Sequence, residues 1–279
     1  MIGQHFTYLA PREIEEALEL LASAGDDCAV LGGGTWLVPN MTFAAHRPRF
    51  VLDPKHLQLA SIVDQDDAVL IGARATYQDA IGSPVVAEHL SLLASMASGI
   101  TGGASIVGQG TMGGSACYGN PSSDVPACLV ALRARLRLSS AGGTRDVEAT
   151  QFFTGRFSTA RRPDELLTAI VIPKLPTHVR CGYYKLKFST GSWPIVTAAA
   201  VVDGDGVRVV LGAASAVPIL TEVVLPANAS KDELKAVASS CAAIAAADEL
   251  ADELAGPGYR RRVAPSIVLR ALKRCGVSQ

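Results

Sequence analysis

The chain has 279 residues, enough for one large domain or two to three small ones and too many for a miniprotein held together by disulfides. Its 25 Lys and Arg residues and 26 Asp and Glu residues give a net charge of −1, which provides no long-range attraction for nucleic acid or an anionic membrane. With 49% hydrophobic and 18% charged residues, the sequence supplies a full hydrophobic core and excludes global disorder.

The N-terminal part of the chain predicts short strands alternating with helices. Residues 6–9 indicate a strand, and the apolar spacing over residues 14–21 predicts a helix with Pro11 in its first turn, ending at residues 25–27. An apolar strand at residues 29–31 leads into three consecutive glycines. Further strands are expected at residues 50–53 and 69–72, and further helices at residues 77–83 and 91–98.

The segment 89–123 contains no Asp, Glu, Lys or Arg, so its length alone would allow a membrane-spanning helix. Its eight glycines, its proline and its many Ser and Thr residues argue against such a helix and indicate backbone buried closely against another part of the protein. A helix at residues 124–132 and a strand at residues 134–139 are expected to follow.

The C-terminal part begins where the proline-containing segment 173–178 interrupts the pattern, and it predicts three strands followed by two helices. Asp203-Gly204-Asp205-Gly206 is typical of a hairpin turn between the second and third strands. Ser230 and Glu233 form a capping box that begins the first helix, and the alanine-rich run 242–247 belongs to that helix. The strands are expected at residues 183–188, 197–202 and 207–213, and the last helix at residues 259–275. The fold class is therefore α+β.

Two glycine-rich loops are candidate binding sites. Residues 32–35, Gly-Gly-Gly-Thr, directly follow an apolar strand, and residues 108–115 repeat the same chemistry further along the chain. Glycines allow positive φ and carry no β-carbon, so several backbone N–H groups of each loop can converge on an anion, and Thr35 adds a hydroxyl donor. Asp124 follows nine residues after Ser115, a position suited to accept a hydrogen bond from a ribose hydroxyl. One loop alone would indicate a tight turn, whereas the pair indicates a diphosphate ligand.

Neither loop has the pattern of a common phosphate-binding motif. We expect no helix to begin on residues 32–34, which lack the G-x-G-x-x-G spacing of a Rossmann fold. Residues 108–113 match that spacing by letter, but they continue into residues 115–121, which do not indicate the start of a helix. The sequence contains no G-K-[ST] for a Walker A loop. The loops therefore indicate a nucleotide bound in a different kind of fold.

Metal ligands and covalent attachment of a ligand are not expected in this chain. The six cysteines include no C-x-x-C pair, which argues against zinc or an iron–sulfur cluster, and they are interpreted as small buried residues of a reducing, cytoplasmic compartment. Residues 1–10 lack the basic and apolar regions of a signal peptide. Neither loop contains a histidine, and the chain's histidines are interpreted as surface or core residues: His5, His46, His56, His89 and His178.

Both loops also match the pattern of a known family. Residues 31–41 read L-G-G-G-T-W-L-V-P-N-M, and residues 110–126 contain G-T-M-G-G-S followed by P-S-S-D-V-P. They resemble the two FAD-diphosphate loops, L-A-G-G-x-x-L-x-P-x-M and G-T-I-G-G-N/D…P-x-x-D-x-P, of the FAD-binding medium subunit of molybdenum hydroxylases, the carbon-monoxide-dehydrogenase and xanthine-dehydrogenase family. The resemblance covers almost the whole chain, in the same order, through residues 6–11, 71–73, 164–173, 184–193 and 259–261.

The resemblance implies an α+β fold with two domains. A two-lobed FAD-binding domain of the PCMH and vanillyl-alcohol-oxidase type would span residues 1–176, with lobes at about 1–57 and 58–176. A small α/β domain of the carbon-monoxide-dehydrogenase flavoprotein type would span residues 177–279.

The resemblance also implies which residues bind FAD, without a covalent bond. The two loops would hold the diphosphate, Asp124 would contact the ribose and phosphate region, and Leu167 would lie by the flavin or adenine. Lys185, with Lys187 as the second candidate, and Trp193 would lie beside the isoalloxazine ring, although a solvated strand face and core packing are the simpler interpretations of these residues. The implied contacts are Gly32, Gly33, Gly34, Thr35, Trp36, Gly110, Thr111, Gly113, Gly114, Ser115, Asp124, Leu167, Lys185 and Trp193.

The function implied by the resemblance is electron transfer. A large partner subunit would carry the molybdenum cofactor, and a small partner subunit would pass electrons from [2Fe–2S] clusters to the FAD of this oxidoreductase subunit, in a heterotrimer or its doubled form. No acid, base or nucleophile constellation is visible in this chain, which agrees with that division of labour. The substrate and the terminal acceptor stay open. Arg260-Arg261-Arg262 would either contact a partner or begin an ordinary exposed helix.

Three positions depart from the family pattern and keep two alternatives open. Ala29 stands where the family usually has a lysine, Val107 lies where it has R-N-x-G-T, and Ser115 replaces the common Asn or Asp, which leaves the affinity for FAD open. One alternative is a stand-alone flavoenzyme of the vanillyl-alcohol-oxidase superfamily, for which the segment after Thr177 is small. The other is a non-catalytic scaffold that has lost its flavin.

Overall fold

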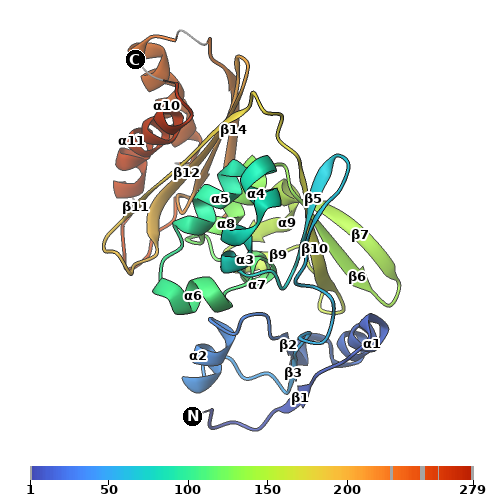
Figure 1. Ribbon diagram of the computed structural model, residues 1–279. Coiled ribbons are helices and arrows are strands. Elements are labelled where there is room, and N and C mark those ends of the chain that lie inside the picture. Colours follow the sequence, from blue (N-terminus) through green and yellow to red (C-terminus); the bar gives the residue numbers. More distant parts are fainter. Residues whose placement is uncertain (1, 227–228, 246–248, 257, 278–279) are drawn as a thin grey trace.

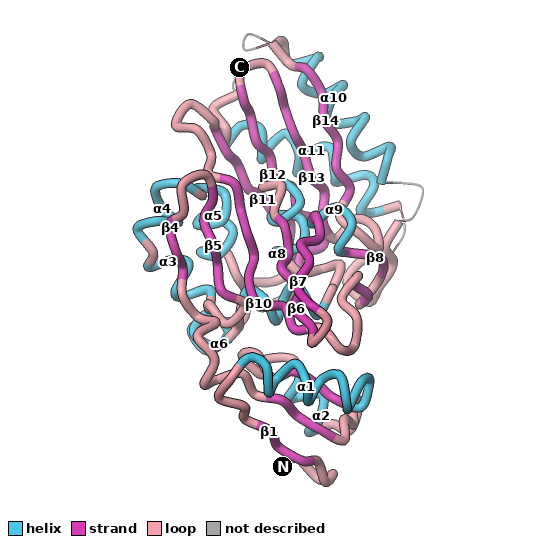
Figure 2. The backbone as a smooth tube through the Cα atoms, turned by 90° about the vertical axis from the view of Figure 1, so that its right-hand side faces the viewer, coloured by secondary structure: helices cyan, strands magenta, loops and turns pink. Residues whose placement is uncertain are grey.

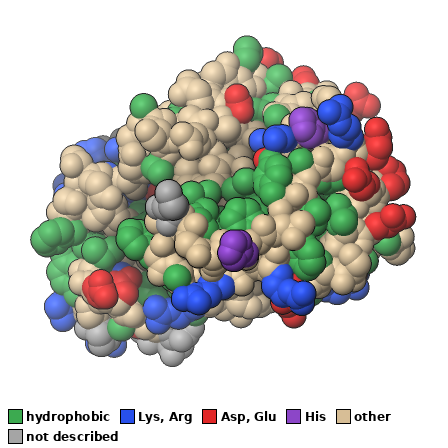
Figure 3. Space-filling model, turned by 90° about the horizontal axis from the view of Figure 1, so that it is seen from below, with side chains coloured by type: hydrophobic (Ala, Val, Ile, Leu, Met, Phe, Trp, Pro, Cys, Tyr) green, Lys and Arg blue, Asp and Glu red, His purple; other side chains and the backbone are tan. Residues whose placement is uncertain are grey.

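The computed structural model describes residues 2–226, 229–245, 249–256 and 258–277, and in these ranges the strands form three main sheets and a two-stranded ribbon (Figure 1). The first sheet belongs to a small N-terminal lobe. It is parallel, in the order β1 (Thr7–Leu9), β3 (Phe50–Leu52) and β2 (Cys28–Val30). Figure 3 views this end of the molecule and shows hydrophobic side chains gathered across the middle of the face.

Helix α1 (Ile14–Ala24) packs on this first sheet through the predicted apolar face. Ala17, Leu18 and Leu21 are buried and form a cluster with Leu52 of β3. The helix begins after Glu13, so the prediction that Pro11 lies in its first turn was wrong: Pro11 precedes the N-cap by two residues. Its end passes into the short 3-10 turn η1 (Gly25–Asp27), as predicted.

The second sheet has five antiparallel strands and lies in the middle of the molecule. Their order is β4 (Ile62–Asp64), β5 (Ala68–Gly72), β10 (Leu166–Pro173), β6 (Arg135–Ser140) and β7 (Gly143–Glu148). Its inner face is covered by helices α3 (Tyr77–Gly82), α4 (Pro84–His89), α5 (Ser91–Ser98), α7 (Met112–Tyr118), α8 (Asp124–Ala131) and α9 (Ala149–Phe152). The ribbon pairs β8 (Phe153–Gly155) with β9 (Ser158–Thr159).

The third sheet is antiparallel and follows the predicted break at the prolines. It runs in the order β11 (Arg180–Lys187), β12 (Pro194–Asp203), β13 (Gly206–Gly212) and β14 (Ile219–Val224). One face packs on the central helices, and the other carries α10 (Lys231–Ala245) and α11 (Tyr259–Arg274), so β12 is apolar on both faces (Figures 1 and 2). Gly204 has φ +57° in the predicted hairpin turn, and the capping box of Ser230 and Glu233 begins α10 as predicted. The end of the alanine-rich run lies outside the described residues.

Several helices arise where the glycine content argued against them. Helix α2 (Leu37–Thr42) begins directly after the first glycine loop, and α6 (Gly103–Gln109) and α7 lie within the uncharged segment. No helix begins on residues 32–34, as predicted, but α7 begins within the second loop, so the prediction that the second loop begins no helix was wrong. Helix α7 begins because Thr111 caps it, accepting a hydrogen bond from the Gly114 N–H at 3.1 Å.

Arg260 is a structural residue of the C-terminal domain rather than an exposed helix start. Its side chain is fully buried, donates to the carbonyl oxygens of Ile195, Leu250 and Ala255 at 2.8–2.9 Å, and pairs with the Asp252 carboxylate at 2.8 Å. Arg261 and Arg262 are exposed. None of the helices in the described ranges is long and apolar enough to cross a membrane.

Candidate functional site

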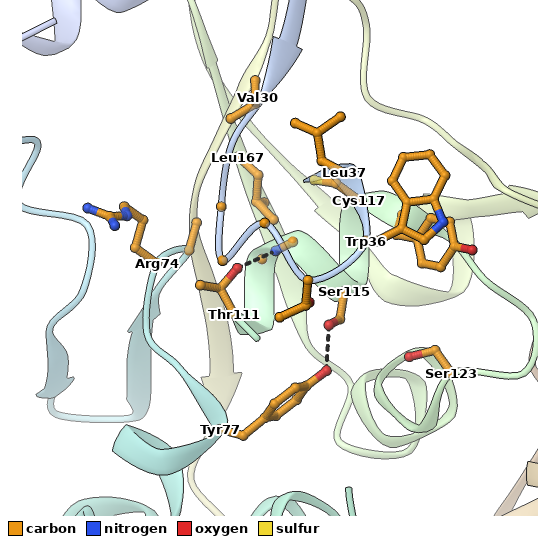
Figure 4. A pocket seen from close by; sticks show the side chains of 18 of the residues that line it. Val30, Trp36, Leu37, Arg74, Tyr77, Thr111, Ser115, Cys117, Ser123 and Leu167 are labelled. Carbon is orange, nitrogen blue, oxygen red and sulfur yellow. Dashed lines mark hydrogen bonds between the residues drawn. The ribbon is translucent and has the colours of Figure 1, made fainter. Parts of the chain in front are cut away.

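A cavity of about 450 Å³ opens where the N-terminal lobe meets the central helices and the beginning of the third sheet (Figure 4). Twelve of the fourteen residues predicted to bind FAD line it. They are Gly32, Gly33, Gly34, Thr35, Trp36, Thr111, Gly113, Gly114, Ser115, Asp124, Leu167 and Trp193. The structure does not place Gly110 and Lys185 in the lining.

The two glycine loops lie against each other at one wall of this cavity. A β-carbon on Gly33 would stand 1.7 Å from the carbonyl oxygen of Gln109, and one on Gly32 would stand 2.7 Å from Oγ1 of Thr111. Glycine is therefore required at positions 32 and 33 because two backbones approach each other closely. Within the two loops, positive φ is found only at Gly34, with φ +71°.

The first loop presents a row of free donors. No hydrogen bond among the described residues uses the backbone N–H groups of residues 32–36, whereas the flanking Leu31 and Val38 N–H groups donate to Leu52 and Gly34 at 2.8 and 3.0 Å. Residues 32–35 are half-buried and Trp36 is exposed, so these five consecutive donors beside the cavity are available to a ligand that accepts hydrogen bonds. A row of backbone donors of this kind favours an anion.

The second loop differs from the first, because its N–H groups are already paired. Met112 and Gly113 donate to the carbonyl oxygens of Ala75 and Ala73 at 2.8 and 3.0 Å, and Ser115 donates to Thr111. A β-carbon on Gly113 would stand 2.5 Å from the Ala73 oxygen, so this glycine allows the loop to pack on the end of β5. The second loop therefore offers side-chain hydroxyl groups, and the prediction of a second row of free N–H groups was wrong.

Asp124 lines the cavity, but its carboxylate is already engaged. Lys185 on β11 donates to both oxygens, at 2.8 and 3.0 Å, and the Tyr183 hydroxyl donates to one of them. Burial raises the pKa of Asp124 from its ordinary value, and the Lys185 ammonium opposes that rise. Lys185 is thus brought to the site through Asp124, and the ion pair ties the first turn of α8 to the third sheet.

Gly110 lies beneath the second loop. Its N–H donates to Ile106 and its carbonyl oxygen accepts from the Tyr77 N–H at 3.1 Å. A β-carbon on Gly110 would stand 2.8 Å from the Tyr77 ring, so the glycine allows the ring to pack against the loop.

Sequence reasoning missed several residues of the cavity wall, because they come from segments without a motif. The missed lining residues include His46, Arg74, Tyr77, Tyr118 and Arg161. His46, which the sequence suggested was an ordinary surface or core residue, lies with its ring 5.9 Å from that of Trp36, and the ring of Tyr118 lies 4.6 Å from that of Trp36. The Nε atom of Arg74 is buried with no hydrogen-bond partner among the described residues.

These residues fit a dinucleotide with flat aromatic ends. Five free N–H groups and the Arg74 guanidinium can meet negative charge, while Leu167, Ile100 and Trp193 supply apolar wall. In the described part of the chain no group of three His, Cys, Asp or Glu residues is arranged to hold a metal ion. The lining of the cavity therefore suits an organic anion.

Comparison with known proteins agrees with this chemistry. Residues 4–175 match the family model for the FAD binding domain in molybdopterin dehydrogenase. The chain is 31% identical to the carbon monoxide dehydrogenase medium chain of Hydrogenophaga pseudoflava, over 98% of this chain and 97% of that one. It is 28% identical to the nicotine 6-hydroxylase medium subunit of Paenarthrobacter nicotinovorans, over 96% of each. A solved structure of carbon monoxide dehydrogenase from Hydrogenophaga pseudoflava superposes with a TM-score of 0.92 over 99% of each chain, at 31% identity.

The chain belongs to the family of FAD-binding medium subunits of molybdopterin-dependent dehydrogenases. The family, the α+β FAD-binding fold and the flavin cofactor expected from the sequence are thereby confirmed, as is its class, a subunit of an oxidoreductase.

Proposed function

We propose that this chain holds FAD non-covalently in the cavity and serves as the electron-transfer subunit of a heterotrimeric molybdenum hydroxylase, or of its doubled form. One partner is a large subunit with the molybdenum cofactor, and the other is a small subunit with [2Fe–2S] clusters. The row of free N–H groups at residues 32–36 carries the proposal, because it gives the diphosphate of a dinucleotide five donors beside one cavity. Bound FAD supplies a centre that accepts single electrons and stores two.

We assign the residues of the site as follows. The first loop binds the diphosphate, with Thr111 and Ser115 of the second loop beside it on the same wall, and Leu167 and Trp193 pack on the ring systems. Lys185 acts through Asp124. The two residues form a buried ion pair at the cavity wall. Gly110 acts by allowing the second loop to pack.

The domain boundary is proposed at residue 176, between β10 and β11. A first domain of residues 1–176, with lobes at about 1–57 and 58–176, contains the first two sheets, and residues 177–279 contain the third. The protein would act in the cytoplasm with its partners. Exposed hydrophobic side chains of the N-terminal lobe, including Trp36, Val38 and Phe43, support contact with another subunit.

An absorption spectrum tests the flavin assignment. We would purify the chain alone, record its visible spectrum, and record it again after incubation with excess FAD and desalting. Flavin bands at about one FAD per chain, released by acid as free FAD, are the expected result.

Two results would contradict the proposal. A protein that retains no FAD either alone or when assembled with its partners would be a scaffold without a flavin. An isolated chain that oxidises an organic substrate by itself would be a stand-alone flavoenzyme.

A further inference from the structure

The hydroxyl groups of Tyr77 and Ser115 contact each other on the wall of the cavity. The sequence did not predict this pairing. The side-chain oxygens of Tyr77, at the first position of α3, and Ser115, on α7, are joined by a hydrogen bond (Figure 4). Both residues line the cavity, and Tyr77 is 4% exposed. Among the described residues each of these oxygens has no other hydrogen-bond partner.

The Tyr77 side chain is fixed in place from several directions. Thr76 and Asp79 form a capping box that holds the first turn of α3, with hydrogen bonds of 2.8 and 3.1 Å. The Tyr77 N–H donates to Gly110, and the ring packs on the face of Gly110 that lacks a β-carbon. Tyr77 therefore contacts the second loop at its beginning through the backbone and further along through its hydroxyl group.

The acidity of the two hydroxyl groups sets the direction of their hydrogen bond. A phenol is a stronger acid than an aliphatic alcohol and so the better donor, which makes Tyr77 the donor and Ser115 the acceptor. Burial raises the pKa of Tyr77 from its ordinary value of 10.0, so the phenol keeps its proton at physiological pH. Accepting this bond polarises the Ser115 hydroxyl, whose own proton is left to donate to a third group.

That third group has to lie in the cavity, which Ser115 lines together with the first loop. The two loops are in contact there, since a β-carbon on Gly32 would stand 3.7 Å from Cα of Gly114, the residue that precedes Ser115. A ligand bound by the free N–H groups of residues 32–36 would therefore lie on the same wall as Ser115.

We propose that Tyr77 is a positioning residue, which holds the Ser115 hydroxyl so that its proton points at a phosphoryl oxygen of bound FAD. This inference rests on the proposed function and extends it to a residue outside the two loop motifs. In this arrangement the Ser115 hydroxyl donates a hydrogen bond to the diphosphate, because its hydrogen bond with Tyr77 fixes the direction of its proton.

A double-mutant cycle tests the proposal. The dissociation constant of FAD is measured for the apoprotein with Tyr77→Phe, with Ser115→Ala and with both changes. Each single change is expected to weaken binding about three- to tenfold, because one charge-assisted hydrogen bond is lost or misdirected. The double variant is expected to bind no more weakly than the weaker single variant, because both changes remove the same contact.

The ³¹P resonances of bound FAD identify the group that Ser115 contacts. In protein saturated with FAD, Tyr77→Phe and Ser115→Ala are expected to shift the same one of the two phosphorus signals. A ring that only packs against Gly110 is kept by the Phe variant and would leave both signals in place.

Tyr259→Phe is the matched control, since Tyr259 is 40% exposed on α11 and is absent from the cavity lining. It is expected to leave the dissociation constant and both signals unchanged. Unchanged FAD binding in Tyr77→Phe, or losses that multiply in the double variant, would overturn the role of Tyr77 while the wild type still binds FAD. A wild type that binds no FAD would contradict the proposed function instead.

Discussion

Gly33 is the residue at which the two loops touch, and it gives the sharpest test of the site. In Gly33→Ala the new β-carbon would stand 1.7 Å from the Gln109 oxygen and 3.2 Å from Cα of Gly110, so backbone must move. We expect FAD binding to weaken at least about tenfold and the free energy of unfolding to fall by about 1–3 kcal/mol, as for an overpacked core. Titration with FAD and urea unfolding measure the two effects.

Gly108→Ala is the control for this variant. Gly108 lies nearby on α6, has nothing within 4 Å of an added β-carbon, and needs no positive φ. Its replacement is expected to leave FAD binding unchanged and to stabilise the helix by about 0.5–1 kcal/mol. Equal losses in both alanine variants would show that the contact at Gly33 is not the cause.

Arg260 is a second residue whose role differs from its apparent place in the sequence. Arg260→Met removes the partner of Asp252 and five hydrogen bonds, three to buried carbonyl oxygens and two to the Asp252 carboxylate, so we expect a loss of about 3–5 kcal/mol at pH 7. Urea unfolding of the wild type and the variant at several pH values measures this loss.

The same comparison has a predicted pH dependence. Burial raises the pKa of Asp252, but Arg260 and local N–H donors outweigh it, so that the pKa lies below its ordinary value of 3.8. A lowered carboxylate pKa stabilises the fold above pH 3.8, and this stability is lost as the pH falls through the lowered value. The difference in free energy of unfolding between the wild type and Arg260→Met should therefore become smaller in that acidic range. A difference that stays constant would contradict the ion-pair account.

At the scale of elements, the Lys185–Asp124 pair joins α8 to β11. Lys185→Met leaves the Asp124 carboxylate buried without its cation, so we expect about 3–5 kcal/mol of lost stability at pH 7. Burial raises the pKa of Asp124 even in the wild type, and removing the cation raises it further, so the loss should grow as the pH rises through the raised wild-type pKa. Adding Asp124→Asn, which can still accept from Tyr183, should recover most of the stability. Thermal unfolding of the wild type and the two variants checks this, and a double variant as unstable as Lys185→Met alone would contradict it.

The sequence predicted part of the strands and part of the helices, and it missed the strands β4, β7, β8, β9, β10 and β14 and the helices α2, α4, α6, α7 and α9. The segments that form β5, β12 and β13 are buried and therefore apolar, and a short apolar run in a sequence indicates a buried strand. Helix α7 was missed because its glycines are poor helix formers in isolation. They are needed there, since Gly113 packs on the Ala73 backbone, and that tertiary contact exceeds the cost in helix propensity.

The sequence predicted those residues of the candidate site that belong to a recognisable motif. The loop residues were found by their glycines, and Asp124 by its distance from them. The pairing of Asp124 with Lys185, and of Ser115 with Tyr77, depends on which elements the topology brings together across 61 and 38 residues, and no local pattern carries that information.

For the whole molecule, FAD is a ligand of the folded state only. At a free FAD concentration of about 100 times its dissociation constant, binding should add about 2.7 kcal/mol to the free energy of unfolding. For a chain of this size that corresponds to a rise of roughly 5–10 °C in the midpoint of thermal unfolding. Scanning calorimetry with and without FAD measures the rise, with riboflavin, which lacks the diphosphate, as the comparison ligand. An equal rise with riboflavin would contradict the role given to the first loop.

The cavity wall reaches from Ala29 in the N-terminal lobe to Trp193 in the connection between β11 and β12. A ribosome that makes the chain from its N-terminus has therefore made every residue up to Trp193 before the last part of the wall exists. The N-terminal lobe presents its row of donors early, but it has nothing to close over a ligand. Cofactor loading in the cell is therefore expected to follow synthesis of residues 29–193, so the supply of FAD acts on a chain whose cavity wall is complete.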